Sequence, residues 1–342
     1  MFGFQRTPYD VRFYEEKLRD FLPDTMIDNH VHVYKKEMVD SFRHPGQQSW
    51  PRLVAEDCSI EDLEQSYLDM FPGKRVIPVL MSEPNANLTV ANNYVLECAK
   101  ARNLPVLYCT DPTMPAEEIC HAIKDRGFCG IKPYLNHSPS YIPANEIRIF
   151  DFLPREHLEV LNELGGIAIL HIARPGRLKD PVNVAQMMMI DSDYPNAKVI
   201  IAHTGRAYAP EDVGDAFETL KHSKHLLFDF TANTLSYSME ACIKAVGTDR
   251  FLFGSDMPIT KMRMYRIAEN GTYINVVPRG LYGDVSNDPH MRESDSDEIS
   301  NFMYEELNGF RIAAESLKLT RKQIEDVMCN NAARIFGMEK LL

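Results

Sequence analysis

Eight short apolar runs alternate with helical stretches along this chain of 342 residues. The runs cover residues 26–32, 75–81, 104–109, 129–134, 166–172, 198–203, 225–230 and 250–255. The helical stretches cover residues 59–70, 86–102, 115–125, 154–164, 181–190, 211–222, 235–247 and 301–318, and a last helix covers 320–336. Nearly continuous apolar strands are typical of parallel sheets covered by helices, and parallel neighbours need long crossover connections. The alternation therefore predicts an α/β fold, a (β/α)8 TIM barrel.

An open, doubly wound sheet is the alternative fold for such a pattern. It is disfavoured because no glycine-rich GxGxxG turn opens the first helix, and because polar residues follow the first, fifth, sixth and eighth strands. Those residues meet only if the strands close into a barrel, whose active sites lie at the carboxyl ends of the strands. We expect one domain over residues 1–342, with residues 1–25 as a short helical extension.

Two segments exceed the usual length of a connection between a strand and a helix. Residues 33–58 contain the single tryptophan, and residues 257–300 are rich in Gly, Asn, Asp and Ser. Long loops at the carboxyl face of a barrel usually cap a site, so we expect 257–300 to form a loop or lid after the eighth strand. A surface excursion or an oligomer contact is the alternative, and the polar stretch 290–298 fits local disorder.

Composition excludes several classes of partner. The formal net charge of -12 disfavours nucleic acid and anionic membranes, because binding to phosphate groups relies on a concentrated basic surface. No run approaches the roughly 18 apolar residues of a membrane span, and the N-terminus lacks a secretion signal. Seven cysteines without a CxxC pair indicate reduced thiols. We therefore expect a cytoplasmic protein with a small-molecule substrate, in which a homo-oligomer remains possible.

The sequence DNHVH at residues 28–32 carries two imidazoles two residues apart on a strand, so both project from one face. Single polar residues also end three later strands, namely His171, His203 and Asp256. Histidines and a carboxylate can hold a divalent ion such as zinc and leave room for a water molecule. The alternative is a set of core histidines bonded to the backbone, with Asp256 capping the loop that follows it.

These same motifs, DNHVH, the ILH ending at His171, the AHTG containing His203 and the FGSDMP containing Asp256, resemble the amidohydrolase superfamily in its amidohydrolase-2 branch. The resemblance implies a TIM barrel that carries one or two divalent metals. It implies that the ion is held by His30, His32, His171 and Asp256. His203 would be a ligand in a two-metal enzyme, and an acid or carbonyl polariser beside the ligands in a one-metal enzyme. We expect one ion, zinc, with manganese as an alternative.

Lys132 ends the fourth strand, where some two-metal relatives bridge their ions with a carbamylated lysine. The alternative is a lysine paired with a nearby carboxylate. A related nuclease branch carries a glutamate on this strand, so Lys132 disfavours DNA cleavage.

Arginines gather just beyond the candidate ligands, at positions 174, 177, 206, 263 and 266. A guanidinium binds a carboxylate through two parallel hydrogen bonds, so the cluster indicates a small anionic substrate. The alternative is ordinary pairing of these arginines with acids at the surface. Arg174, Arg206 and Tyr134 are the candidate substrate-binding residues. Tyr208 also lies nearby, but such tyrosines are more often packing residues.

The sequence thus predicts a metal-dependent hydrolase. Asp256 would accept a proton from an attacking water, and His203 or an arginine would stabilise the oxyanion formed at a lactone, ester or amide carbonyl. The substrate would be a small carboxylated metabolite. A nonhydrolytic decarboxylase of an aromatic or unsaturated acid is the first alternative, and a barrel that binds without turnover is the second.

Overall fold

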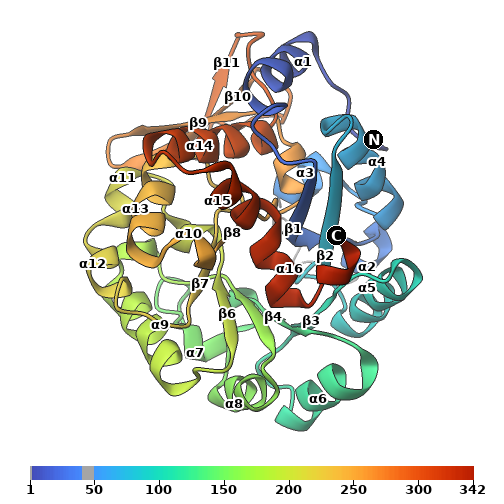
Figure 1. Cartoon of the computed structure of the whole chain (residues 1–342), viewed down its shortest axis with the longest axis vertical. Helices are drawn as coiled ribbons and strands as arrows, with labels where there is room; N and C mark the ends of the chain where they lie inside the picture. Colours follow the sequence, from blue (N-terminus) through green and yellow to red (C-terminus); the bar gives the residue numbers. More distant parts are fainter. Residues whose placement is uncertain (1, 41–49) are drawn as a thin grey trace.

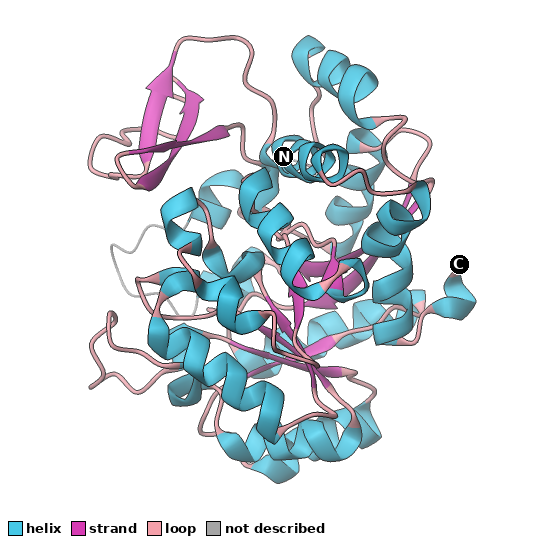
Figure 2. Ribbon diagram, turned by 60° about the vertical axis from the view of Figure 1, so that its left-hand side comes forward, coloured by secondary structure: helices cyan, strands magenta, loops and turns pink. Residues whose placement is uncertain are grey.

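The computed structural model describes residues 2–40 and 50–342, which form a ring of parallel strands surrounded by helices (Figures 1 and 2). The barrel strands are β1 Thr25–His32, β2 Arg75–Met81, β3 Leu107–Thr110, β4 Gly130–Pro133, β5 Ile167–Leu170, β6 Lys198–Ile201, β7 Leu227–Asp229 and β8 Phe251–Leu252. All eight predicted strands are present, and most are shorter than predicted. The polar residues at their ends therefore lie in the loops of the carboxyl face.

The strands close into a barrel. β1 pairs with β2, and β3 to β8 pair in sequence order. Two parallel bridges join these groups, Leu80 with Val106 and Val31 with Met257. The second bridge connects the first strand to the chain just beyond the eighth, which excludes the open-sheet alternative and confirms the TIM barrel.

Helices cover the outside of the barrel, and the predicted helical stretches are present. The first half contains α1 Pro8–Phe13, η1 Tyr14–Leu18, α2 Lys36–Asp40, α3 Trp50–Val54, α4 Ile60–Met70, α5 Leu88–Arg102, α6 Ala116–His121, η2 Ala122–Arg126, η3 Leu135–His137, α7 Ile149–Phe152 and α8 Arg155–Leu164. The second half contains η4 Arg177–Lys179, α9 Pro181–Asp193, α10 His203–Arg206, α11 Pro210–Val213, α12 Ala216–Leu220, α13 Ser236–Val246, η5 Thr248–Arg250, η6 Ile259–Lys261, α14 Phe302–Ser316, α15 Arg321–Glu325, η7 Asp326–Asn330, α16 Asn331–Phe336 and η8 Glu339–Leu341. The helix predicted over 211–222 is interrupted at Gly214, whose φ of 51° breaks the helical path.

Alternate residues of each strand face two different apolar layers, which explains the nearly continuous apolar runs. Ile167 and Ile169 of β5 pack inside the barrel, whereas Ala168 and Leu170 pack against the surrounding helices. Phe336 of α16 belongs to the inner layer, so the C-terminal helix closes the amino end of the barrel (Figure 1). The carboxyl end is left as the face available for a site.

Residues 257–300, which we expected to form a loop or lid after the eighth strand, include regular secondary structure. They contain a three-stranded sheet, β9 Tyr265–Glu269, β10 Thr272–Pro278 and β11 Met291–Ser294, in the order β11-β10-β9 (Figure 2). β9 and β10 form a hairpin whose turn, Asn270-Gly271, has positive φ at both residues. An Asn-Gly pair between strands is a strong hairpin signal that we overlooked. The predicted disorder over 290–298 is wrong where β11 pairs with β10. We call β9–β11 the insert sheet.

The N-terminal extension is helical as predicted, in α1 and η1. Part of the long segment 33–58 forms α2 and α3, and its residues 41–49 lie outside the described residues. Among the helices that the structure describes, none has the length and apolar character required to cross a membrane.

Candidate metal centre

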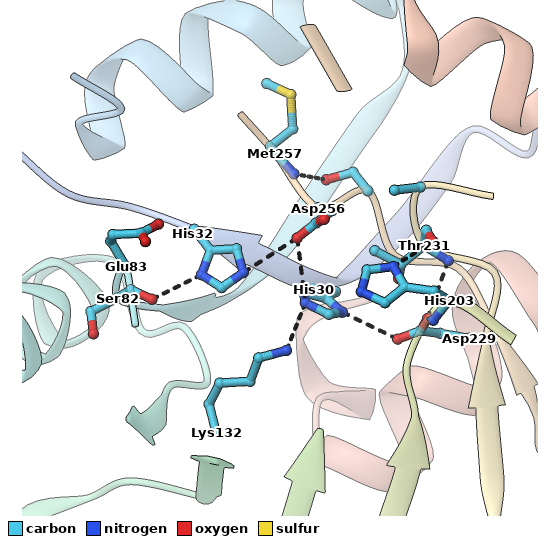
Figure 3. Close-up of polar contacts among 12 residues, drawn as sticks. His30, His32, Ser82, Glu83, Lys132, His203, Asp229, Thr231, Asp256 and Met257 are labelled. Carbon is cyan, nitrogen blue, oxygen red and sulfur yellow. Dashed lines mark hydrogen bonds and ion pairs between the residues drawn. The ribbon is translucent and has the colours of Figure 1, made fainter. Parts of the chain in front are cut away.

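His30 and His32 are oriented by hydrogen bonds at the far side of each ring. His32 Nδ1 lies 2.8 Å from the carbonyl oxygen of Ser82, and His30 Nδ1 lies 3.3 Å from Oδ2 of Asp229. Because both acceptors require the proton on Nδ1, each ring keeps its lone pair on Nε2. These two Nε2 atoms lie 3.5 Å (His30) and 3.3 Å (His32) from Oδ1 of Asp256 (Figure 3).

The donor atoms of His30, His32 and Asp256 all lie within 4.8 Å of one another. Burial lowers the pKa of His30 well below its usual value, so its imidazole is neutral, the form that binds metals. Burial alone would raise the pKa of Asp256, but the surrounding histidine rings, His32 first, lower it overall. Two imidazoles and an ionised carboxylate are a suitable donor set for zinc or a similar divalent ion.

An unusual backbone conformation orients Asp256, and also His203, towards the candidate metal centre. Asp256 and His203 both have a φ of 59°, in the left-handed region that side chains seldom adopt. The Asp256 amide donates to the carbonyl of His30 at 2.8 Å, and the His203 amide donates to Oδ1 of Asp229 at 2.7 Å. Such conformations cost about 1–3 kcal/mol each and are concentrated at functional sites.

His203 lies beside the three candidate ligands. Its ring centroid is 5.4 Å from that of His30, and its Nδ1 lies 2.8 Å from the carbonyl oxygen of Thr231. Nδ1 therefore donates and Nε2 keeps its lone pair. Burial lowers the pKa of His203 to about 4, so the ring is neutral at physiological pH.

His171 lies beside the rings of His203 and Tyr134. Its centroid is 5.1 Å from that of His203 and 5.6 Å from that of Tyr134. Burial, and then the positive charge of Arg206, lower the pKa of His171 well below its usual value. His171 is not in the group of three atoms within 4.8 Å, so its role as a ligand stays a prediction. Its buried Nδ1 has no hydrogen-bond partner within the described part of the chain.

Lys132 of β4 is buried beneath the histidine pair (Figure 3). Its Nζ lies 2.8 Å from Nε2 of His30, the atom that would bind a metal. Burial lowers the pKa of this amine to about 8. Within residues 2–40 and 50–342 it forms no ion pair, so the predicted alternative of a carboxylate partner is not what the structure shows. Carbamylation stays a prediction.

Replacing Lys132 with methionine tests how the amine affects metal binding. We expect zinc affinity at neutral pH to rise about tenfold, because the change removes about 1.4 kcal/mol or more of repulsion between the amine and the cation. Calorimetric titration of the apoprotein measures this. Lys198→Met, at the amino end of β6, is the matched control and should bind zinc as the parent does. A loss of bound metal in Lys132→Met would contradict this expectation and favour a carbamate ligand.

Most arginines of the predicted cluster have acidic partners. Arg174 Nε lies 3.1 Å from both carboxylate oxygens of Asp180, and Arg177 lies 2.7 Å from Asp212. The alternative that we gave, pairing with local acids, therefore describes these two side chains better than substrate binding does. The predicted substrate contact of Arg174 would require it to leave the residue that caps α9.

Arg263 is likewise paired, through both terminal nitrogens, with the buried Asp10 of α1. Arg206 differs, because among the described residues its guanidinium donates only to the carbonyls of Ile172 and Ala173, at 3.4 and 3.0 Å. It thus keeps a positive charge beside His171.

Asp229 is a candidate site residue that sequence analysis missed. It ends β7, is fully buried, and connects the ring of His30 to the backbone of His203. A carboxylate that interrupts the apolar run LLFDF was the available signal, the same kind of signal that identified Asp256. Carboxylates that accept the second N–H of a ligating histidine fix its tautomer and strengthen it as a ligand.

We expect Asp229→Asn to weaken metal binding by about 10- to 100-fold, because the amide is a poorer acceptor for the His30 ring. Competition with a chromogenic chelator measures the affinity. Asp191→Asn is the control, since Asp191 is also buried but its carboxylate accepts from the backbone amides of residues 224–226. Equal metal affinity in the two variants would contradict the role given to Asp229.

A parallel barrel that gathers imidazoles and a carboxylate at the carboxyl ends of its strands is the architecture of metal-dependent barrel enzymes. The family profile described as Amidohydrolase matches residues 27–338. The chain therefore belongs to the amidohydrolase-2 family, whose members are enzymes, and the resemblance seen in the sequence is confirmed.

Several solved structures share the fold. A zinc-bound amidohydrolase from Burkholderia multivorans is 14% identical with a TM-score of 0.59, covering 92% of this chain and 99% of its own. A probable 2-pyrone-4,6-dicarboxylic acid hydrolase from Acinetobacter baumannii, with citric acid bound, is 16% identical with a TM-score of 0.57 and the same coverage. A dihydroxybenzoic acid decarboxylase from Polaromonas, with manganese and an inhibitor bound, is 14% identical with a TM-score of 0.54, covering 92% and 98%. A comparison with curated proteins gives no match.

Proposed function

We propose that this protein is a metal-dependent hydrolase that attacks a lactone, ester or amide bond of a small carboxylated metabolite. The observation that carries the proposal is the convergence of His30, His32 and Asp256, whose donor atoms lie within 4.8 Å of one another. Membership of the amidohydrolase-2 family supports it. So does the zinc in one structural neighbour, and we propose one zinc ion here, with manganese as the alternative.

A bound divalent ion would lower the pKa of a water molecule to about 7. Asp256 is ionised and reaches both histidine rings, so its carboxylate is placed to accept the proton of that water. His203 holds its proton on Nδ1 towards Thr231, and its neutral Nε2 is an acceptor in the resting protein. It can act as an acid only after taking up a proton. Arg206, permanently charged, is the better donor for a developing oxyanion.

Decarboxylation is the second candidate, favoured by the manganese-bound decarboxylase among the structural neighbours. Product analysis with a panel of lactones, N-acyl compounds and aromatic carboxylic acids, run in water enriched in oxygen-18, separates the two. The hydrolase proposal expects one labelled oxygen in the product and no carbon dioxide. Release of carbon dioxide without incorporation of label would replace it with the decarboxylase.

Binding without turnover is the remaining alternative, and the effect of metal on stability tests it. At a free zinc concentration 100 times the dissociation constant, we expect the metal to stabilise the fold by about 2.7 kcal/mol. Thermal unfolding with zinc and with chelator measures the difference. His30→Ala is the control and should gain much less. A parent protein that retains no metal and unfolds identically in both buffers would favour the binding barrel.

We also propose a cytoplasmic location, which the seven free cysteines support, because a reducing compartment preserves thiols.

A further inference from the structure

Arg266 lies on β9 of the insert sheet and is enclosed by aromatic rings. Its guanidinium carbon is 4.5 Å from the ring centroid of Tyr208, and 4.8 Å from those of Tyr273 and Phe302. Two of its donors are used locally. Nε donates to Oδ1 of Asn275 at 2.8 Å, and one terminal nitrogen donates to the carbonyl of Ala232 at 3.1 Å. The remaining donors are left for another acceptor.

No carboxylate within 4 Å balances the charge of Arg266 in the part of the chain that the structure describes. The neighbouring Arg177 is itself positive and is already paired with Asp212. The carboxylate of Glu306 accepts the amide of Ala232 rather than a bond from Arg266, and burial raises the pKa of Glu306 well above its usual value. Arg266 is partly buried, and burying a guanidinium without a counter-charge is costly, which favours an anion that is bound from outside.

The position of Arg266 connects it to the proposed active site. The ring of Tyr208, against which the guanidinium packs, is 6.4 Å from the ring of His203. Ala232, its backbone acceptor, follows Thr231, whose carbonyl accepts the Nδ1 proton of His203. One aromatic side chain therefore separates the guanidinium from the imidazole that neighbours the candidate ligands.

We propose that Arg266 is the anchor for the carboxylate of the substrate, so that the insert sheet selects anionic substrates for the barrel. The proposal rests on the proposed function, because it assigns the substrate's charged group to that same site. A carboxylate would take a charge-assisted bond from the free terminal nitrogen, and the neutral aromatic walls would strengthen the attraction by excluding water.

The test compares two probes of equal shape, benzoate and benzamide, by calorimetric titration of metal-stripped protein. Removing the metal prevents carboxylates from binding to the ion, and it makes the result independent of whether the protein hydrolyses anything. We expect the parent to bind benzoate more tightly than benzamide. Arg266→Gln should weaken benzoate binding about tenfold or more, the effect of losing a hydrogen bond to a charged group, and leave benzamide binding unchanged.

Arg292→Gln is the matched control, because Arg292 lies on β11 of the same sheet but is half-exposed and paired with Glu269. It should bind benzoate as the parent does. If Arg266→Gln fails to fold, Arg266→Lys, which keeps the charge but loses the planar fork, should still weaken benzoate several-fold. Equal binding of the two probes by the parent, or unchanged benzoate affinity in a folded Arg266 variant, would overturn the proposal. Failure of the hydrolase assignment would instead appear in the product analysis.

Discussion

Replacing Asp256 with asparagine is expected to lower kcat/KM by about a thousandfold, within the range for loss of a general base. Asparagine keeps the shape of the side chain but removes its charge, so it can neither accept the proton of water nor balance a cation beside His30 and His32. Steady-state kinetics on the substrate found by the product screen measures the effect, and circular dichroism checks that the barrel remains folded.

The control for this change is Asp284→Asn, in the exposed part of the segment that follows Asp256. It should leave kcat/KM unchanged. His30→Ala should also abolish turnover while the protein stays folded. If folded Asp256→Asn retained the full activity of the parent, the carboxylate would have no part in the chemistry.

Replacing Asp62 with alanine is expected to destabilise the protein by about 3–5 kcal/mol, the cost of breaking a buried ion pair from one side. Asp62 of α4 pairs with Lys261 of η6, and the two side chains are 6% and 7% exposed. The variant leaves the ammonium group buried without its partner, and the amide of Gly3 loses an acceptor at 2.6 Å. Urea denaturation measures the change in the free energy of unfolding.

Two further variants serve as comparisons for Asp62→Ala. Glu56→Gln breaks the exposed pair with Lys36 and should cost less than about 1 kcal/mol. The double variant Asp62→Leu with Lys261→Met removes both charges and should recover much of the lost stability. A cost below about 1 kcal/mol for Asp62→Ala would mean that the pair does not hold η6 against α4.

The sequence predicted the barrel and the convergence of His30, His32 and Asp256 because both depend on local patterns. Apolar runs mark the strands, and parallel strands bring the residues at their carboxyl ends together whatever lies between them. The insert sheet was missed although its Asn-Gly turn was visible, because the polar composition of 257–300 was given more weight than the turn.

The partners of the arginines were beyond prediction, since they depend on contacts between distant residues. Arg263 forms an ion pair with Asp10, which lies 253 positions away in the sequence. Nothing in the sequence around either residue indicates the pairing. Asp229 could have been noticed as a polar break in a strand, but its contact with His30 crosses 199 positions. Arg206 and Arg266 have no carboxylate partner among the residues that the structure describes, and this became visible only in the folded chain.

Anomalous diffraction at the zinc absorption edge, from crystals grown with zinc, tests the proposed centre most directly. We expect one strong peak about 2.0–2.2 Å from Nε2 of His30, Nε2 of His32 and a carboxylate oxygen of Asp256. A fully loaded crystal with its zinc elsewhere, and with these three side chains contacting no metal, would contradict the proposed metal centre and the hydrolase built on it.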